Sequence, residues 1–236
     1  MEVLAGRLPW LRWSILAGLA LVALLFVANV AASPALLRDA QFPIYLLVLV
    51  VLVAFYLALT LWWTARPILT AALWWGILCG LVTGLGWLLE IGAGNLAVGQ
   101  TWQLIPYFGG TLIALALTLL AGATGVLATH TVRGGLIAGT WCGMVSGLIG
   151  CLALLALPRL FLVTLQQDAQ TIAEFGRSGA PDLVTYIVGD YSAAAIAHLG
   201  LGLLLGLVLG ALGAVIGAGV VRGTSHQSAL SPEERI

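Results

Sequence analysis

Residues 139–148 read Gly-Thr-Trp-Cys-Gly-Met-Val-Ser-Gly-Leu and residues 76–85 read Gly-Ile-Leu-Cys-Gly-Leu-Val-Thr-Gly-Leu, with the same residue at six of the ten positions. A shorter form of this pattern occurs near the start of the chain, where Trp-Ser-Ile-Leu-Ala-Gly-Leu at 13–19 parallels Trp-Gly-Ile-Leu-Cys-Gly-Leu at 75–81. The copies occur in the first, third and fifth long apolar segments. This spacing predicts one helical hairpin that is used three times.

The composition is typical of membrane proteins. Hydrophobic residues make up 61% of the chain and charged residues 8%, values far from those of soluble domains. A hydrocarbon core of about 30 Å is crossed by a helix of about 20 residues. Six apolar stretches are long enough, at about residues 12–32, 43–64, 68–89, 107–128, 135–157 and 194–221. We therefore predict an all-α bundle of six transmembrane helices, since lipid offers the backbone no hydrogen-bonding partner.

The sequence predicts a single transmembrane domain, residues 1–222, followed by a tail at 223–236 that lacks apolar periodicity and is expected to be disordered. Its hairpins are expected at about residues 12–66, 68–133 and 135–222. An insertion at about 158–192 places the most polar part of the chain between the fifth and sixth spans. Within it, apolar residues recur at helical spacing from Phe161 to Phe175, which predicts an amphipathic helix on the outer surface.

Arginine determines the predicted topology, because the chain contains no lysine. In a six-span arrangement most arginines lie at the end that holds both termini, and most carboxylates lie at the other end. The positive-inside rule then predicts cytoplasmic termini, and the Ala-, Leu- and Gly-rich composition suggests a bacterial inner membrane. The first span resembles a signal peptide that ends at Val30-Ala31-Ala32. We expect it to be retained, because residues 13–19 match the later copies.

Glycines at four-residue spacing mark the helix faces that we expect to pack closely. Residues four apart share one helix face, and a face without side chains lets another backbone approach. The rows are Gly76, Gly80 and Gly84, then Gly135, Gly139, Gly143 and Gly147, and finally Gly202, Gly206 and Gly210. Spans three to six should therefore form the centre, and the bulky second span should face lipid or a partner.

Ionisable residues within the spans are few, and the candidate binding residues lie near the outer ends. Glu90 closes the third span, and Asp190 and His198 flank the start of the sixth. An ionisable group within the membrane is costly and by default functional. One hypothesis is therefore a polar outer pocket formed by Glu90, Asp190 and His198, and the alternative is that all three are solvated residues at the span ends.

The sequence gives no indication of a metal, a cofactor or a nucleic-acid partner. The net charge is zero, so no basic surface would attract nucleic acid. Cys79, Cys142 and Cys151 form no Cys-x-x-Cys pair and are interpreted as small packing residues. His130 and His198 are expected at opposite membrane faces, whereas a haem with two histidine ligands needs them at matched depth.

Two stretches, Ser146-Gly147 and Ala197-His198-Leu199-Gly200, resemble the serine and histidine segments of rhomboid intramembrane proteases. The resemblance implies Ser146 as nucleophile and His198 as its base, although Met144 stands where rhomboids have the first glycine of Gly-x-Ser-Gly. In size and six-span topology the chain is also similar to the substrate-binding membrane subunits of vitamin uptake transporters. That second resemblance implies an architecture and no site residues.

The sequence thus favours a non-catalytic integral membrane protein. Its spans lack charge at their centres and offer surfaces for close packing, as expected of an accessory or structural subunit that packs against a partner membrane protein or another copy of itself. The first alternative is a small-molecule transport or capture subunit that uses the outer pocket. The second is an intramembrane serine hydrolase that uses Ser146 and His198.

Overall fold

The computed structural model describes residues 8–66, 69–96 and 101–229, which form helices and no strand. Six of the helices are long and apolar enough to cross a membrane: α2 (Leu8–Ala32), α3 (Phe42–Thr64), α4 (Thr70–Leu96), α5 (Leu104–Thr129), α6 (Val132–Leu160) and α9 (Leu183–Ala229). Short helices connect them: η1 (Pro34–Arg38), η3 (Thr101–Gln103), α7 (Leu162–Gln166) and α8 (Ala169–Ser178). The prediction of an all-helical, multi-pass membrane protein is confirmed.

Tight connections are built from polar residues that end one helix and start the next. His130 adopts a left-handed backbone with φ of 53° and donates its N–H to the carbonyl of Val126, which ends α5. Thr131 then caps α6, because its hydroxyl accepts the Gly134 N–H at 3.1 Å. A cap of this kind satisfies a backbone donor that the first helical turn leaves free. The α5–α6 turn is therefore short, and the two helices run antiparallel.

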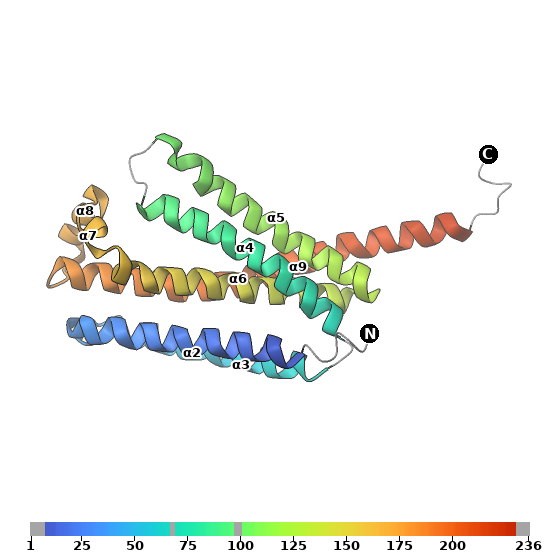
Figure 1. The fold of residues 1–236 in the computed structure, drawn as a ribbon, viewed down its shortest axis with the longest axis horizontal. Coiled ribbons are helices and arrows are strands. Elements are labelled where there is room, and N and C mark those ends of the chain that lie inside the picture. The colour runs from blue at the N-terminus through green and yellow to red at the C-terminus, as the bar shows by residue number, and fades with distance from the viewer. Residues whose placement is uncertain (1–7, 67–68, 97–100, 230–236) are drawn as a thin grey trace.

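Helix α6 lies at the centre of the bundle and is the most buried of the six spans. It packs along α9, α4 and α5, and these helices also pack on one another. Figure 1 shows α4 and α5 on one side of α6 and α9, and the α2–α3 hairpin on the opposite side. We call α4, α5, α6 and α9 the four-helix core.

Glycines lie where the core helices come closest. A methyl group on Gly143 of α6 would collide with Gly202 of α9, and one on Gly139 would collide with Gly210. A methyl group on Gly206 of α9 would lie 2.9 Å from the Gly139 carbonyl oxygen. The α4 row faces the other side of α6, since a methyl group on Gly76 would lie 2.7 Å from the Ala138 carbonyl oxygen, and one on Gly80 would lie 2.9 Å from that of Cys142. Gly84, Gly135, Gly147 and Gly202 also lie at contacts between core helices.

The α2–α3 hairpin is attached more loosely. Helix α3 is the least buried span, and its buried residues are Leu49, Tyr56 and Thr60. Helix α2 turns a row of apolar side chains, from Leu11 to Phe26, toward α6. The exposed faces of both helices are apolar, as required of surfaces in contact with lipid.

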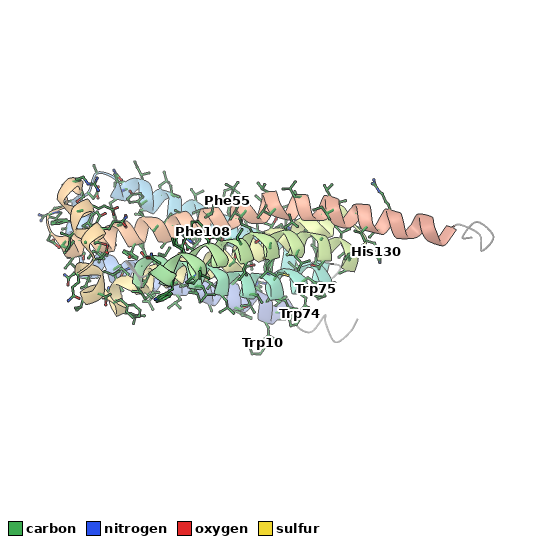
Figure 2. The ribbon with its side chains drawn as sticks, turned by 90° about the horizontal axis from the view of Figure 1, so that it is seen from above. Trp10, Phe55, Trp74, Trp75, Phe108 and His130 are labelled. Atoms are coloured by element: carbon green, nitrogen blue, oxygen red, sulfur yellow. The ribbon has the colours of Figure 1, made fainter. Side chains whose placement is uncertain are left out.

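The two ends of the bundle differ in the segments that lie there. The segments η1, α7 and α8 lie at one end, which we call the α8 end, and α2 begins at the opposite end, beyond which α9 extends (Figure 1). Figure 2 shows Trp10, Trp74 and Trp75 toward that opposite end. Trp62 lies there too, with the Arg66 guanidinium 4.8 Å from its ring centroid. Tryptophan and arginine together are typical of a membrane–water interface.

Four features differ from the sequence-based expectation. Helix α4 continues to Leu96 instead of ending at about residue 89, so Glu90 lies inside this helix and not at its end. The polar insertion holds two short helices, because Asp168 interrupts the expected amphipathic helix and its carboxylate accepts the Thr171 N–H to cap α8. Helix α9 starts at Leu183 instead of about residue 194, so Asp190 lies inside it. At its other end α9 continues to Ala229, past residue 223, where a disordered tail was expected to begin; residues 230–236 lie outside the described part of the chain.

Candidate ligand-binding site

A cavity of about 570 Å³ opens at the α8 end, between the α2–α3 hairpin and α9. This volume falls in the range of small-molecule sites, about 300 to 1,000 Å³. One wall comes from the end of α2, η1 and the start of α3, and the other from the α8–α9 connection and the first three turns of α9. We call it the hairpin cavity, because it exists where the hairpin stands away from the core.

The deep part of the hairpin cavity is apolar. Phe26 of α2 and Phe42 of α3 stack with ring centroids 6.2 Å apart, and Val30 and Leu36 extend this surface. Phe26 lies about 9 Å inside the span that ends at Ala32, given a rise of 1.5 Å per residue. The cavity therefore reaches from the polar connections down to the depth of the hydrocarbon.

Opposite charges line the two walls of the cavity. Arg38 and Asp39 project from the hairpin wall, and Asp190 belongs to the α9 wall. Asp39 accepts the Gln41 N–H at 2.8 Å. Within the described part of the chain, Arg38 and Asp190 form no salt bridge with each other or with any other residue. Each of these two charges is thus available to a ligand.

Ser192 adds an unsatisfied polar group to the same wall. Its side chain is only 6% exposed, and its hydroxyl has no hydrogen-bond partner among the described residues. It lines the hairpin cavity two positions after Asp190. A buried hydroxyl without a partner costs free energy of about 1 to 3 kcal/mol, so a bound polar molecule would relieve this cost.

A second, smaller cavity of about 180 Å³ lies on the other side of α9. Tyr186 and Asp190 line both cavities. The Tyr186 hydroxyl donates to Glu174 of α8 at 3.1 Å, and the Tyr191 hydroxyl donates to Asn95 of α4 at 2.6 Å. These bonds hold α8 and the end of α4 against α9, so the wall that carries Asp190 is fixed on both sides.

The start of α9 is fixed by Asp182. Its carboxylate accepts the backbone N–H and the hydroxyl of Thr185, both at 2.8 Å. These hydrogen bonds favour the ionised carboxylate and hold the pKa of Asp182 below its ordinary value. The cap therefore keeps the α8–α9 connection in place at neutral pH.

Asn29 attaches the hairpin to the core next to this site. It is fully buried, its amide donates to the Leu155 carbonyl of α6 at 3.0 Å, and its side-chain oxygen accepts from Arg159 at 2.8 Å. Sequence reasoning missed this link. The available signal was a single asparagine in the otherwise apolar first span, because a polar group at such a position needs a partner.

The three candidate binding residues do not line one cavity. Asp190 lines both cavities, whereas Glu90 and His198 line neither. Glu90 packs against Gly110 of α5, and its carboxylate lies near Tyr107. The His198 ring contacts Trp87 edge-on, with centroids 5.4 Å apart, and its Nε2 has no partner among the described residues. Both residues thus lie in helix contacts away from the hairpin cavity.

Ser146 and the cysteines are buried in the core. The Ser146 hydroxyl donates to the Gly143 carbonyl at 3.2 Å, and no hydrogen bond joins it to His198, which is also a described residue. Cys142 lies 3.6 Å from the Thr83 hydroxyl and 3.8 Å from that of Thr118. Among the described residues, no group of three or more His, Cys, Asp or Glu side chains is arranged to hold a metal ion.

Comparisons with protein-family models, with curated proteins and with solved structures found no match to this chain. The geometry of the α8 end is therefore the basis on which we assign a function.

Proposed function

We propose that this protein is a non-catalytic integral membrane protein that binds a small amphipathic molecule in the hairpin cavity. The observation that carries the proposal is the cavity of about 570 Å³, whose walls hold both stacked phenylalanines and charged side chains. An amphipathic ligand would match both parts, because its apolar portion would be buried and its polar group would meet Arg38, Asp190 and Ser192.

We further propose that the α8 end faces away from the cytoplasm of a bacterial cell. Arg66, Arg133 and Arg222 lie at the opposite end, and the positive-inside rule favours that end as cytoplasmic. In this orientation the hairpin cavity would take its ligand from the outer leaflet or from the space outside. The role would be substrate capture, either for transport by this chain or for delivery to a partner.

The proposal of a non-catalytic role is supported by the surroundings of Ser146. A serine nucleophile needs a base within hydrogen-bonding reach, and the Ser146 hydroxyl is directed to the Gly143 carbonyl instead. The His198 ring is engaged by Trp87. We therefore favour a packing role for Ser146 over a hydrolase.

A cavity-filling substitution tests the proposal. Ala193 lines the hairpin cavity, whereas Ala197, one turn later on α9, is exposed and does not. Protein purified from native membranes in mild detergent would be extracted, and copurifying small molecules would be quantified by mass spectrometry. We expect Ala193→Trp to lose a molecule that wild type and Ala197→Trp retain. Equal recovery from both variants would contradict a ligand in the hairpin cavity.

A second candidate function, an accessory subunit or a homo-oligomer, is favoured by the length of α9. At 47 residues this helix is about 70 Å long, and it continues past the bundle (Figure 1). A methyl group on Gly217 would meet Ala123 of α5 at 2.7 Å, but Gly219 and Gly223 have no neighbour within 4 Å among the described residues. Purification in mild detergent would recover a stoichiometric partner protein if this part of α9 binds one.

We also propose that the three hairpins descend from one repeated unit. The proposal is supported by the six identities between residues 76–85 and 139–148. It is supported as well by the positions of the matching glycines, since Gly80 of α4 contacts α6 and Gly143 of α6 contacts α9. Equivalent residues would thus serve the same purpose in successive hairpins.

A further inference from the structure

We infer that the hairpin cavity selects a zwitterionic head group, with an ammonium group at Asp190 and a phosphate at Arg38, on a molecule with an apolar portion. This inference rests on the proposed function and names the ligand class of that same site. A phosphoethanolamine group supplies this chemistry, either as the head group of a membrane lipid or as a free soluble compound.

The charges on the two walls define the polar part of the ligand. Arg38 and Asp190 line the same cavity from opposite walls and form no salt bridge within the described part of the chain. A guanidinium binds phosphate oxygens through paired N–H donors. An ammonium group at Asp190 would satisfy the other charge. A ligand with one charge would engage only one of the two walls, whereas a zwitterion would engage both.

Aromatic and hydroxyl groups around Asp190 suit an ammonium ion. Tyr186 lies one turn before Asp190 on α9, and Tyr45 of α3 faces the same cavity from the hairpin wall. Aromatic faces attract cations at exposed sites such as Asp190, although less strongly than where water is excluded. The buried Ser192 hydroxyl has no other partner among the described residues and can accept an N–H.

The balance of charge at the mouth disfavours a purely anionic ligand. Asp39 and Asp190 line the cavity beside Arg38, which is the one cation among the described residues of its walls. The lining carries two carboxylates and one guanidinium, so an anion bound at Arg38 would be repelled by the carboxylates, and a cationic group on the same ligand would offset that repulsion. Discrimination against a partner through unpaired or like charges is a general source of specificity.

The depth of the cavity indicates what the head group is attached to. Phe26, about 9 Å inside α2, stacks on Phe42 at the start of α3, and the two rings form an apolar surface in the same cavity as Arg38 and Asp190. A soluble zwitterion would leave this surface uncovered, whereas the first methylene groups of an acyl chain would cover it. Burial of apolar surface favours binding in proportion to the area covered, so we expect the lipid form to bind more tightly than the free head group.

The test compares three probes by native mass spectrometry of the delipidated full chain in maltoside detergent. The probes are dihexanoyl phosphatidylethanolamine, dihexanoyl phosphatidylglycerol and free glycerophosphoethanolamine, a soluble phosphodiester with the same head group. We expect wild type to bind the ethanolamine lipid about tenfold more tightly than the glycerol lipid, as a charge-assisted hydrogen bond implies. Free glycerophosphoethanolamine binding within about tenfold of the lipid would identify a soluble zwitterion as the ligand, and weaker binding would identify the lipid.

Two substitutions separate the roles of the charges. Asp190→Asn should weaken binding of the ethanolamine lipid about tenfold and leave binding of the glycerol lipid unchanged, so that the preference between the two lipids is lost. Arg38→Gln should weaken both lipids, because both carry the phosphate. Arg133→Gln is the matched control, since Arg133 is an exposed arginine at the opposite end of the bundle and does not line the cavity. A loss of fold would weaken the binding of both lipids together, so it would not produce the predicted loss of preference between them.

The inference is overturned if wild type binds the two lipids equally, or if Asp190→Asn weakens both to the same extent. These failures differ from a failure of the proposed function. If no probe binds but Ala193→Trp still loses a copurifying molecule, the cavity binds a ligand of another class. If no probe binds and Ala193→Trp has no effect, both proposals are wrong.

Discussion

The four-helix core and the α2–α3 hairpin are joined to α6 in different ways. In the core, glycines bring backbones into contact, as where a methyl group on Gly202 would lie 2.5 Å from the Gly143 carbonyl oxygen. The hairpin instead contacts the core through larger side chains and hydrogen bonds from Asn29 and Tyr56. Backbone contact leaves no room for a ligand, whereas side-chain contact leaves the hairpin cavity. The site is therefore expected at the looser of the two attachments.

The largest effect should come from filling a backbone contact in the core. In Gly143→Ala the new methyl group collides with the Gly202 carbonyl oxygen, and neither backbone can move without separating α6 from α9. Overpacking typically costs about 1 to 3 kcal/mol, and we expect the upper end of this range because both partners are backbone. Unfolding in mixed detergent and SDS, followed by tryptophan fluorescence, would measure the loss.

The matched control is Gly200→Ala on the neighbouring α9 helix. A methyl group there would meet Leu52 of α3 at 3.7 Å, which is ordinary van der Waals contact. Alanine also has the higher helix propensity, so stability should be unchanged or slightly raised. Equal destabilisation by the two substitutions would show that the core and the hairpin attachment do not differ in packing.

A smaller effect is expected from Asn29→Leu, which cuts the polar attachment of the hairpin. The Leu155 carbonyl and Arg159 lose their partner, and hydrogen bonds between membrane helices contribute up to about 1.7 kcal/mol. The hairpin should then separate from α9 more often. A Ser192→Cys reporter would detect this separation as faster maleimide labelling, since the three native cysteines are buried.

Asn29→Asp provides the graded control for this experiment. It keeps an acceptor for Arg159, now as a charged pair, and replaces the amide donor to the Leu155 carbonyl by a second acceptor. Its labelling rate should fall between those of wild type and Asn29→Leu. If the Ser192→Cys reporter is labelled no faster in the Asn29→Leu background than in the wild-type background, Asn29 does not hold the hairpin against the core.

The hydropathy and the length of the apolar stretches were sufficient to predict six spans. Six apolar stretches gave six membrane-length helices, because an apolar run of this length has no other way to satisfy its backbone in lipid. The break at Asp168 was not predicted, since apolar periodicity continues across it and an N-cap depends on the backbone conformation there. The end of α9 was misplaced for a related reason: a polar composition does not by itself end a helix.

The candidate site was predicted only in part. Asp190 was singled out as an ionisable residue near a span end, and it lines both cavities. Glu90 and His198 were singled out for the same reason. The orientation of α4 and α9 about their own axes, however, places Glu90 near Tyr107 and His198 against Trp87. Rotation is set by packing between helices, which the sequence of one helix does not reveal. Arg38 and Ser192 were not distinguishable from other polar residues for the same reason.

The smallest effect is expected from Tyr56→Phe, which removes the other hydrogen bond of the hairpin. The buried Tyr56 hydroxyl donates to the Leu199 carbonyl of α9 at 3.0 Å, and the substitution keeps the packed ring. Helix α9 still supplies that carbonyl with a backbone partner, so we expect a loss of about 0.6 kcal/mol in the same unfolding titration. Tyr45→Phe, at an exposed hydrogen bond to Gln41, should leave stability unchanged. A loss from Tyr56→Phe as large as that from Gly143→Ala would mean that the hairpin is held as firmly as the core, and the hairpin cavity would then need another explanation.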